Sequence, residues 1–117
     1  MKLLKDKLRN NQLTIGSWLM MNSITATEVM ALGKFDWLVI DLEHTSIDLQ
    51  STENLIRTIQ ANNMSALVRV EKNEEVIIKK VLDMGADGIV VPMVCSKEDA
   101  LQAINYAKYP PNGNRGV

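Results

Sequence analysis

Apolar and polar residues alternate along the chain with two different periods. A continuous apolar run at residues 37–40 is typical of a strand buried on both faces, and it ends abruptly at Asp41. Further stretches at residues 14–20, 66–70 and 88–92 also have strand character. The pattern therefore predicts strands that begin near residues 14, 37, 66 and 88.

Apolar residues at helical spacing fill the intervals between these strands. We expect helices over residues 2–11, 25–33, 48–62, 73–85 and 96–109. Polar residues with N-cap chemistry precede the apolar stripes, and glycine or asparagine follows several of them. The predicted capping residues are Thr25 with Glu28, Asp48 or Ser51, Asn73, and Ser96 with Asp99.

This alternation predicts an α/β fold built from four successive βα units. Parallel units of this kind form either an open doubly wound sheet or a (β/α)8 barrel. The barrel is favoured because no Gly-x-Gly-x-x-Gly turn follows the first strand and polar residues follow several strands. A complete barrel of this TIM type typically has about 250 residues. We therefore expect residues 1–117 to be the amino-terminal half of a barrel domain, which either continues in a longer chain or pairs with a second half.

Composition narrows the class of function. The chain of 117 residues has 46% hydrophobic and 23% charged residues and a net charge of −1, which gives no general attraction to nucleic acid or to an anionic membrane. No apolar run has the length of a signal peptide core or of a membrane span. Cys95 is the single cysteine, so the chain has no internal disulfide, and we expect a cytoplasmic protein.

Ionisable residues gather directly after the most apolar strand. Asp41, Glu43 and His44 follow residues 37–40, at the strand end where barrel enzymes place their chemistry. An Asp41 carboxylate on one nitrogen of the His44 imidazole would suit a general acid/base, since it orients the ring and raises the basicity of the other nitrogen. A metal site formed by the same three residues is the weaker alternative, because their spacing is not diagnostic.

Arg69 interrupts the apolar strand at residues 66–70. A buried guanidinium requires a partner because it stays charged in proteins. One interpretation is a structural ion pair with Glu43 or Asp41, and the other is a clamp for an anion or oxyanion. Both interpretations hold if a carboxylate keeps Arg69 in place until a ligand binds.

Several motifs of this sequence, in order and spacing, resemble the HpcH/HpaI aldolase family. The resemblance covers essentially the whole chain but only about the first half of the family's domain. The motifs are Gly16-Ser17-Trp18, the run from Phe35 to His44, Val68-Arg69-Val70, Leu82 to Ala86 with Val91 to Val94, and Tyr109 to Val117.

The resemblance implies a (β/α)8 barrel that cleaves 4-hydroxy-2-oxo acids reversibly to pyruvate and an aldehyde through a metal-stabilised enolate. His44 matches the family's acid/base histidine, Asp41 the aspartate paired with it, and Arg69 the arginine that binds substrate and stabilises the enolate oxygen. Trp18 is expected to contact the substrate, and Glu43 matches a glutamate beside the water shell of the metal. The resemblance also implies a homo-oligomer that takes a small 2-oxo acid.

The expected cofactor is a divalent ion, Mg, Mn or Co. Its direct ligands in the family lie downstream of the position that matches residue 117, so we expect no direct ligand within this chain. The 117 residues alone are then expected to bind metal weakly and to catalyse poorly or not at all. The alternative function is a half-barrel module without catalysis that self-associates or binds small oxo acids.

Overall fold

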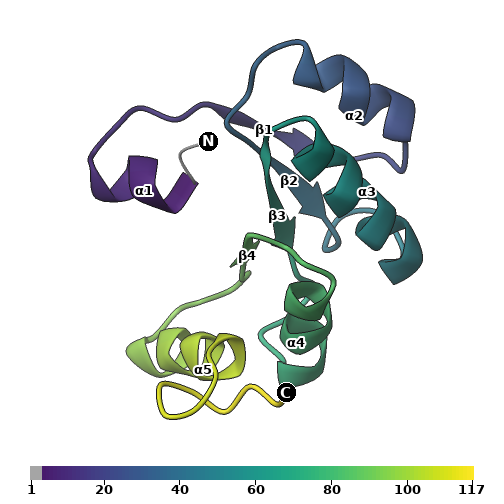
Figure 1. Cartoon of the computed structure of the whole chain (residues 1–117). Helices are drawn as coiled ribbons and strands as arrows, with labels where there is room; N and C mark the ends of the chain where they lie inside the picture. Colours follow the sequence, from purple (N-terminus) through teal and green to yellow (C-terminus); the bar gives the residue numbers. More distant parts are fainter. Residues whose placement is uncertain (1–3) are drawn as a thin grey trace.

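A computed structural model describes residues 4–117 of the chain. Four strands form one parallel sheet in the order β1-β2-β3-β4, so each strand lies beside its neighbour in sequence (Figure 1). The strands are β1 (Gly16–Leu19), β2 (Trp37–Asp41), β3 (Ser65–Arg69) and β4 (Gly88–Val90). All four predicted strands are therefore confirmed, and β4 is shorter than expected.

One helix follows each strand along the chain. The helices are α1 (Leu4–Arg9), α2 (Ile24–Ala31), α3 (Leu49–Ala61), α4 (Glu75–Asp83) and α5 (Lys97–Ala107). Figure 1 shows α2 and α3 beside the strands, α4 and α5 together near β4, and α1 set apart from them. The first predicted helix began at Lys2, and its first two residues lie outside the described part of the chain. The predicted order of four βα units is confirmed.

The two faces of the sheet have different roles. Leu38 and Ile40 of β2 and Ala66 and Val68 of β3 are fully buried and belong to the main apolar core, to which α3 contributes Leu55, Ile56 and Ile59. Side chains alternate along a strand, so the residues between these positions point to the opposite face. Trp18, Val39, Leu67 and Gly88 are in register on that face. It is the face that lines the interior when such strands close into a barrel.

The helix caps agree with the sequence analysis at two helices and differ at two. Asp48 caps α3, and Ser96 with Asp99 forms a complete capping box at α5. The pKa of Asp99 lies below its ordinary value because the amide of Cys95 and the residue Ser96 donate hydrogen bonds to its carboxylate. The expected capping box at Thr25 is wrong, since α2 begins earlier and Ser23 accepts from the amide of Ala26.

The second difference is at α4. The helix begins after Glu74, whose side chain makes no capping bond, and not after Asn73. The Asn73 side chain instead donates to the main-chain oxygen of Asp99 at 2.9 Å. Because the Asn73 side chain makes this long-range hydrogen bond, it does not cap α4 as its residue type predicted.

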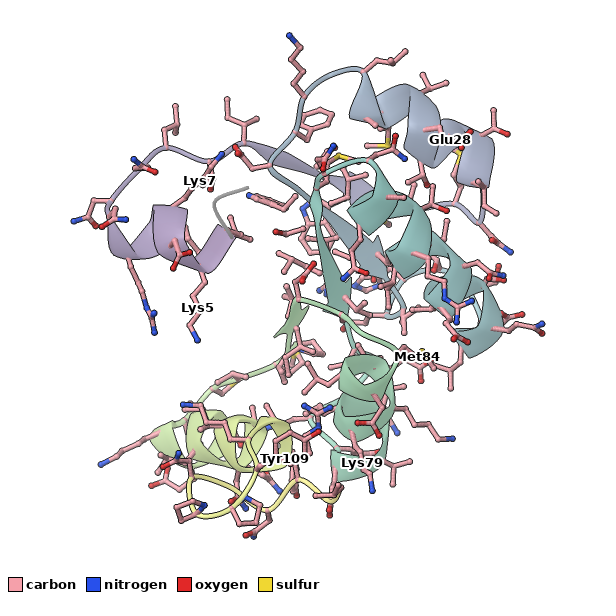
Figure 2. The ribbon with its side chains drawn as sticks, in the orientation of Figure 1. Lys5, Lys7, Glu28, Lys79, Met84 and Tyr109 are labelled. Atoms are coloured by element: carbon pink, nitrogen blue, oxygen red, sulfur yellow. The ribbon has the colours of Figure 1, made fainter. Side chains whose placement is uncertain are left out.

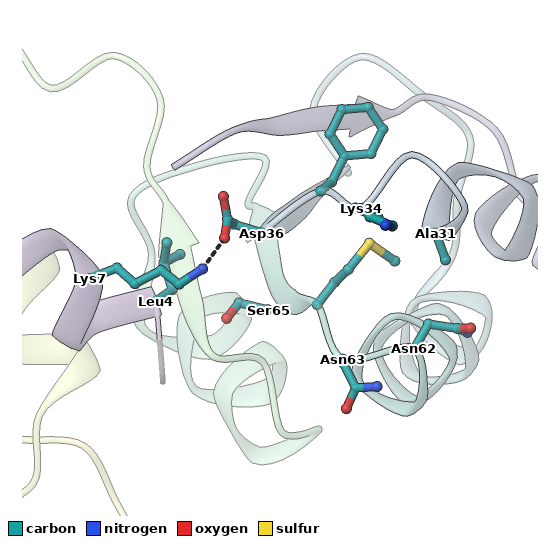
Figure 3. A pocket seen from close by; sticks show the side chains of 10 residues that line it. Leu4, Lys7, Ala31, Lys34, Asp36, Asn62, Asn63 and Ser65 are labelled. Carbon is teal, nitrogen blue, oxygen red and sulfur yellow. Dashed lines mark hydrogen bonds and ion pairs between the residues drawn. The ribbon is translucent and has the colours of Figure 1, made fainter. Parts of the chain in front are cut away.

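Helix α1 is attached at the amino ends of the strands. Lys7 is half-buried and forms an ion pair with Asp36, the residue before β2, whereas Lys5 is exposed and extends away from the helix (Figures 2 and 3). The other carboxylate oxygen of Asp36 accepts from the amide of Ile15 at 2.8 Å. A cavity of about 290 Å³ adjoins this pair (Figure 3). Both contacts lower the pKa of Asp36, with the hydrogen bond from Lys7 as the larger cause.

None of the helices between residues 4 and 117 is long and apolar enough to cross a membrane.

Candidate active site

The predicted site residues meet where β2 and β3 end. Asp41 and Arg69 are the last residues of these strands and are directly paired in the parallel register. The pairing continues for one more step, since the amide of Leu42 donates to the carbonyl of Arg69 at 3.0 Å. Because the strands are parallel, every loop that leaves this edge of the sheet is on the same side of the molecule.

Asp41 is 1% exposed, and its oxygens have separate partners. The Oδ1 atom accepts from the main-chain amides of Glu43 at 2.8 Å and His44 at 3.1 Å. The Oδ2 atom lies 3.5 Å from Nη1 of Arg69. The Thr45 hydroxyl donates to the Asp41 carbonyl, which closes the turn from the other side. The carboxylate therefore shapes the loop after β2 and partly neutralises Arg69.

Arg69 is held from three directions. Besides Asp41, Oε2 of Glu43 lies 2.5 Å from Nη2 of Arg69. The Oε2 atom is buried, and its contact with the guanidinium is an ion pair. The guanidinium carbon is also 5.5 Å from the centre of a Trp18 ring, within the range of a cation–π contact. With 26% of its side chain exposed, Arg69 keeps an accessible side.

The His44 imidazole contacts Glu43 and not Asp41, the carboxylate with which the sequence analysis paired it. Its side chain is 60% exposed, and its Nε2 atom lies 3.6 Å from Oε2 of Glu43. Asp41 binds the main-chain amide of His44 and not the imidazole. The expected Asp41–imidazole pair is therefore not formed here, because the tight turn after β2 directs Oδ1 at two main-chain donors.

The arrangement places a guanidinium, two carboxylates and an accessible imidazole at one edge of the sheet. The guanidinium has a fixed position and is a donor for an oxygen that gains negative charge. The imidazole of His44 is exposed to solvent beside this pair, so a bound ligand could reach it. A small anion that reached Arg69 would lie beside His44, because both side chains contact the same oxygen of Glu43.

These residues do not by themselves form a metal site. Within residues 4–117, no group of three or more His, Cys, Asp or Glu side chains could hold an ion. Both oxygens of Asp41 are engaged, and Oε2 of Glu43 faces the positive charge of Arg69. A divalent cation added between these carboxylates would be repelled by the guanidinium. The donor set therefore does not fit a directly bound divalent ion.

The sequence analysis did not anticipate two polar residues near this edge. Thr45 has a hydroxyl that donates to the main chain of Asp41, and Asn73 bridges the loop after β3 to the start of α5. The Oδ1 atom of Asn73 is buried without a hydrogen-bond partner. Only the spacing of Asp41 and Thr45 was a signal in the sequence, since threonine near a turn commonly bonds to the main chain. The Asn73 bridge joins residues far apart in the chain.

Four parallel strands in sequential order, with an ionisable cluster at their carboxyl ends, are the arrangement found in proteins of the (β/α) barrel class. The family model described as HpcH/HpaI aldolase/citrate lyase matches residues 14–117. The chain therefore belongs to the HpcH/HpaI aldolase/citrate lyase family, as the sequence motifs predicted.

Curated relatives of this chain are named as aldolases. A 5-keto-4-deoxy-D-glucarate aldolase of Escherichia coli is 40% identical over 113 residues, which are 97% of this chain and 44% of the relative. A 2-dehydro-3,6-dideoxy-6-sulfogluconate aldolase of Pseudomonas putida is 36% identical over 109 residues, or 93% of this chain and 43% of the relative. The chain thus spans less than half the length of these relatives.

Solved structures agree in fold over the same extent. The HpcH/HpaI aldolase from Desulfitobacterium hafniense DCB-2 matches with a TM-score of 0.92 and 29% identity, covering 100% of this chain and 46% of its own. The citrate synthase SbnG matches with a TM-score of 0.93 and 35% identity over 97% of this chain and 46% of its own. The predicted fold, a TIM-type barrel represented by its first four βα units, is confirmed by these neighbours.

Proposed function

We propose that residues 1–117 are the amino-terminal half of a barrel aldolase domain, and that the whole protein cleaves 4-hydroxy-2-oxo acids to pyruvate and an aldehyde. The observation that carries the proposal is the cluster of Arg69, Glu43, Asp41 and His44 at the carboxyl ends of β2 and β3. Because the chain belongs to a family that includes aldolases, we assign an aldol cleavage to this cluster.

The chain's own residues can perform the two charge movements of a retro-aldol cleavage. His44 accepts the proton of the 4-hydroxyl group, and the bond between C3 and C4 breaks to release the aldehyde. The electron pair of that bond moves toward the 2-keto oxygen and forms the pyruvate enolate, and Arg69 donates to that oxygen as its charge grows. A proton returned to C3 then completes pyruvate. Trp18, whose ring centre lies 5.5 Å from the guanidinium carbon of Arg69, is proposed to contact the substrate.

The proposed cofactor is a divalent ion, Mg, Mn or Co, which would act as a Lewis acid on the oxo acid. Because the carboxylates described above do not fit direct ligation, we place its ligands outside these residues. Glu43 is proposed to lie beside the water shell of the ion, as in the family pattern. No step assigned to His44 or Arg69 depends on a direct bond between the ion and this part of the chain.

The test uses the full-length protein. Pyruvate in D₂O, with added Mg, Mn or Co, should exchange its methyl protons for deuterium. Proton NMR measures this exchange, and the identity of the aldehyde is not needed for it. His44→Gln should lose the exchange while the protein stays folded. Absence of exchange in the wild-type protein with every metal would contradict the proposal.

A second candidate is carbon–carbon bond formation in the synthetic direction. It is favoured by the similarity to the citrate synthase SbnG. The same enolate would attack a carbonyl acceptor, and His44 would donate a proton to the resulting alkoxide to form the new hydroxyl group. Incubation of the full-length protein with pyruvate and a 2-oxo acid acceptor, followed by mass spectrometry, distinguishes net synthesis from cleavage.

We also propose a cytoplasmic homo-oligomer. The support for the compartment is the free, exposed thiol of Cys95, which fits a reducing environment. The support for association is the exposed apolar surface along β1 and α2, where Met21, Val29 and Leu32 are each more than half exposed. Light scattering of the full-length protein measures the assembly.

A further inference from the structure

Met20 directly follows β1, at the edge of the sheet that carries the site. Continued by one step, the register of β1 against β2 places Met20 level with Asp41. Leu19 is 1% exposed and belongs to the core, whereas Trp18 and Met20 are 43% and 50% exposed. Because side chains alternate along an extended chain, Trp18 and Met20 share the face of the sheet that bears Asp41.

The surroundings of Met20 are apolar and carry no charge. Trp18 and Met20 line a groove of about 570 Å³ between the end of β1 and α2. No charged residue occurs in residues 16–27. The amide side chain of Asn22 donates to the hydroxyl of Ser51 at 2.8 Å, which attaches this loop to the first turn of α3. The loop after β1 therefore offers a held apolar surface and no charge to pair with an ionised group.

The order of the strands gives the direction in which a substrate lies. Arg69 at the end of β3 is assigned to the 2-keto oxygen, and His44 in the loop after β2 is assigned to the hydroxyl group on C4. The next strand in that direction is β1. Neighbouring strands are about 4.8 Å apart, a step that a short carbon chain on C4 can span. The group attached to C4 therefore extends toward the end of β1 and over Met20.

We propose that Met20 is a specificity-determining residue and that it forms, with Trp18, an apolar subsite for the group on C4. The substrate is then a 4-hydroxy-2-oxo acid with an unbranched, uncharged alkyl group on C4, and the aldehyde that it releases is aliphatic. This inference rests on the proposed function and names the substrate class of the same site. Met20 contacts only the part of the substrate that becomes the aldehyde, so it selects the aldehyde and moves no proton.

The experiment measures aldol addition of pyruvate to two aldehydes by the full-length protein. Pentanal carries an apolar chain, and glyceraldehyde has the same number of non-hydrogen atoms but two hydroxyl groups. With the metal that supports exchange of the pyruvate methyl protons, the wild-type protein should have the higher kcat/KM for pentanal. Met20→Ala should lower the ratio of the two kcat/KM values on the order of 10-fold, since an apolar pocket discriminates by about this factor for a missing methylene group. Met20→Leu keeps the apolar volume and should keep the ratio.

Two results would overturn the proposal. One is a wild-type preference for glyceraldehyde, and the other is an unchanged ratio in Met20→Ala, which would leave Met20 as a packing residue. Met21→Ala is the matched control, because it removes the same side chain from the next position, where Met21 is 58% exposed. It should leave the ratio unchanged, and an equal decrease would assign the effect to the shape of the loop and reject the subsite.

The exchange of pyruvate methyl protons separates this inference from the proposed function, because no aldehyde takes part in it. Absence of exchange in the wild-type protein contradicts the proposed function. Exchange without the preference for pentanal overturns only the apolar subsite.

Discussion

The two ends of β2 carry carboxylates that differ in how their charge is satisfied. Asp36, before the strand, pairs with Lys7 and with the amide of Ile15, and its partners serve only to attach α1 and β1. Asp41, at the other end, shares Arg69 with Glu43, and an exposed imidazole lies next to that pair. Both ends look alike in a sequence, as an acid beside an apolar run.

The two ends therefore differ in whether a charged group remains accessible to a ligand. At the amino end one carboxylate meets one lysine, so the charges are balanced and nothing remains for a ligand. At the carboxyl end Arg69 has a second carboxylate and an accessible side, so an incoming anion can compete for it. This agrees with the general rule that conserved chemistry in barrels lies at the carboxyl ends of strands, whereas the amino ends provide stability.

The largest effect is expected at Arg69. Arg69→Lys keeps the charge beside the buried Asp41 but loses the planar fork that can donate two bonds to an oxyanion. Turnover by the full-length protein should fall roughly 100- to 1,000-fold, as when an oxyanion donor is removed. Arg57→Lys on α3 is the control and should be silent. Turnover within twofold of wild type for Arg69→Lys would remove Arg69 from its assigned role.

Asp41→Ala should give the next largest effect, which is a loss of stability. The substitution leaves two amides and a guanidinium without their acceptor, which should lower the free energy of unfolding by about 2 to 3 kcal/mol. Urea unfolding measures the change. A loss no larger than that of Asp36→Ala would contradict the distinction between the buried and the partly exposed carboxylate.

Trp18→Leu tests the ring beside Arg69. A cation–π contact at a partly exposed site contributes about 0.5 to 1 kcal/mol, so kcat/KM should fall about 2- to 5-fold. Trp18→Phe keeps a π face and should restore most of the loss. Equal losses in both variants would show that the size of the side chain matters and not its π system.

Asp36→Ala should lower stability by only about 0.5 to 1 kcal/mol and leave turnover unchanged, because the pair with Lys7 is partly exposed. Thermal unfolding with a parallel activity assay measures both quantities. A large loss of turnover would show that the amino end of β2 is coupled to the site.

The smallest effect is expected on how stability depends on pH in acid. The pKa of Asp36 is lowered in the folded protein, so its contribution to stability is present above the ordinary value of 3.8 and is lost as the pH falls through the lower folded value. Asp36→Ala should therefore flatten the decrease in unfolding free energy below about pH 4 relative to wild type. Parallel curves for the two proteins would contradict the assignment.

Local residue patterns sufficed for the order of elements. A continuous apolar run identifies β2 and apolar residues at helical spacing identify α3 without tertiary information, because burial on one or both faces determines which positions along an element are apolar. These patterns also placed Asp41, Glu43 and His44 directly after the strand at residues 37–40 and Arg69 within the strand at residues 66–70, where the structure ends β3. The caps of α2 and α4 were assigned wrongly, since Ser23 competed with Thr25 at close range and Asn73 found a partner at Asp99.

The pairing of the charges was decided by tertiary structure. Asp41 and Glu43 are two residues apart, and nothing in their local sequence says which of them contacts an imidazole or a guanidinium. The register of β2 against β3 brings Arg69 beside Asp41, and the turn after β2 commits Oδ1 of Asp41 to main-chain amides. The buried carboxylate of Asp41 accepts the main-chain amides of the loop, because buried polar groups require hydrogen-bond partners. The Glu43 carboxylate contacts the side chains of Arg69 and His44 instead.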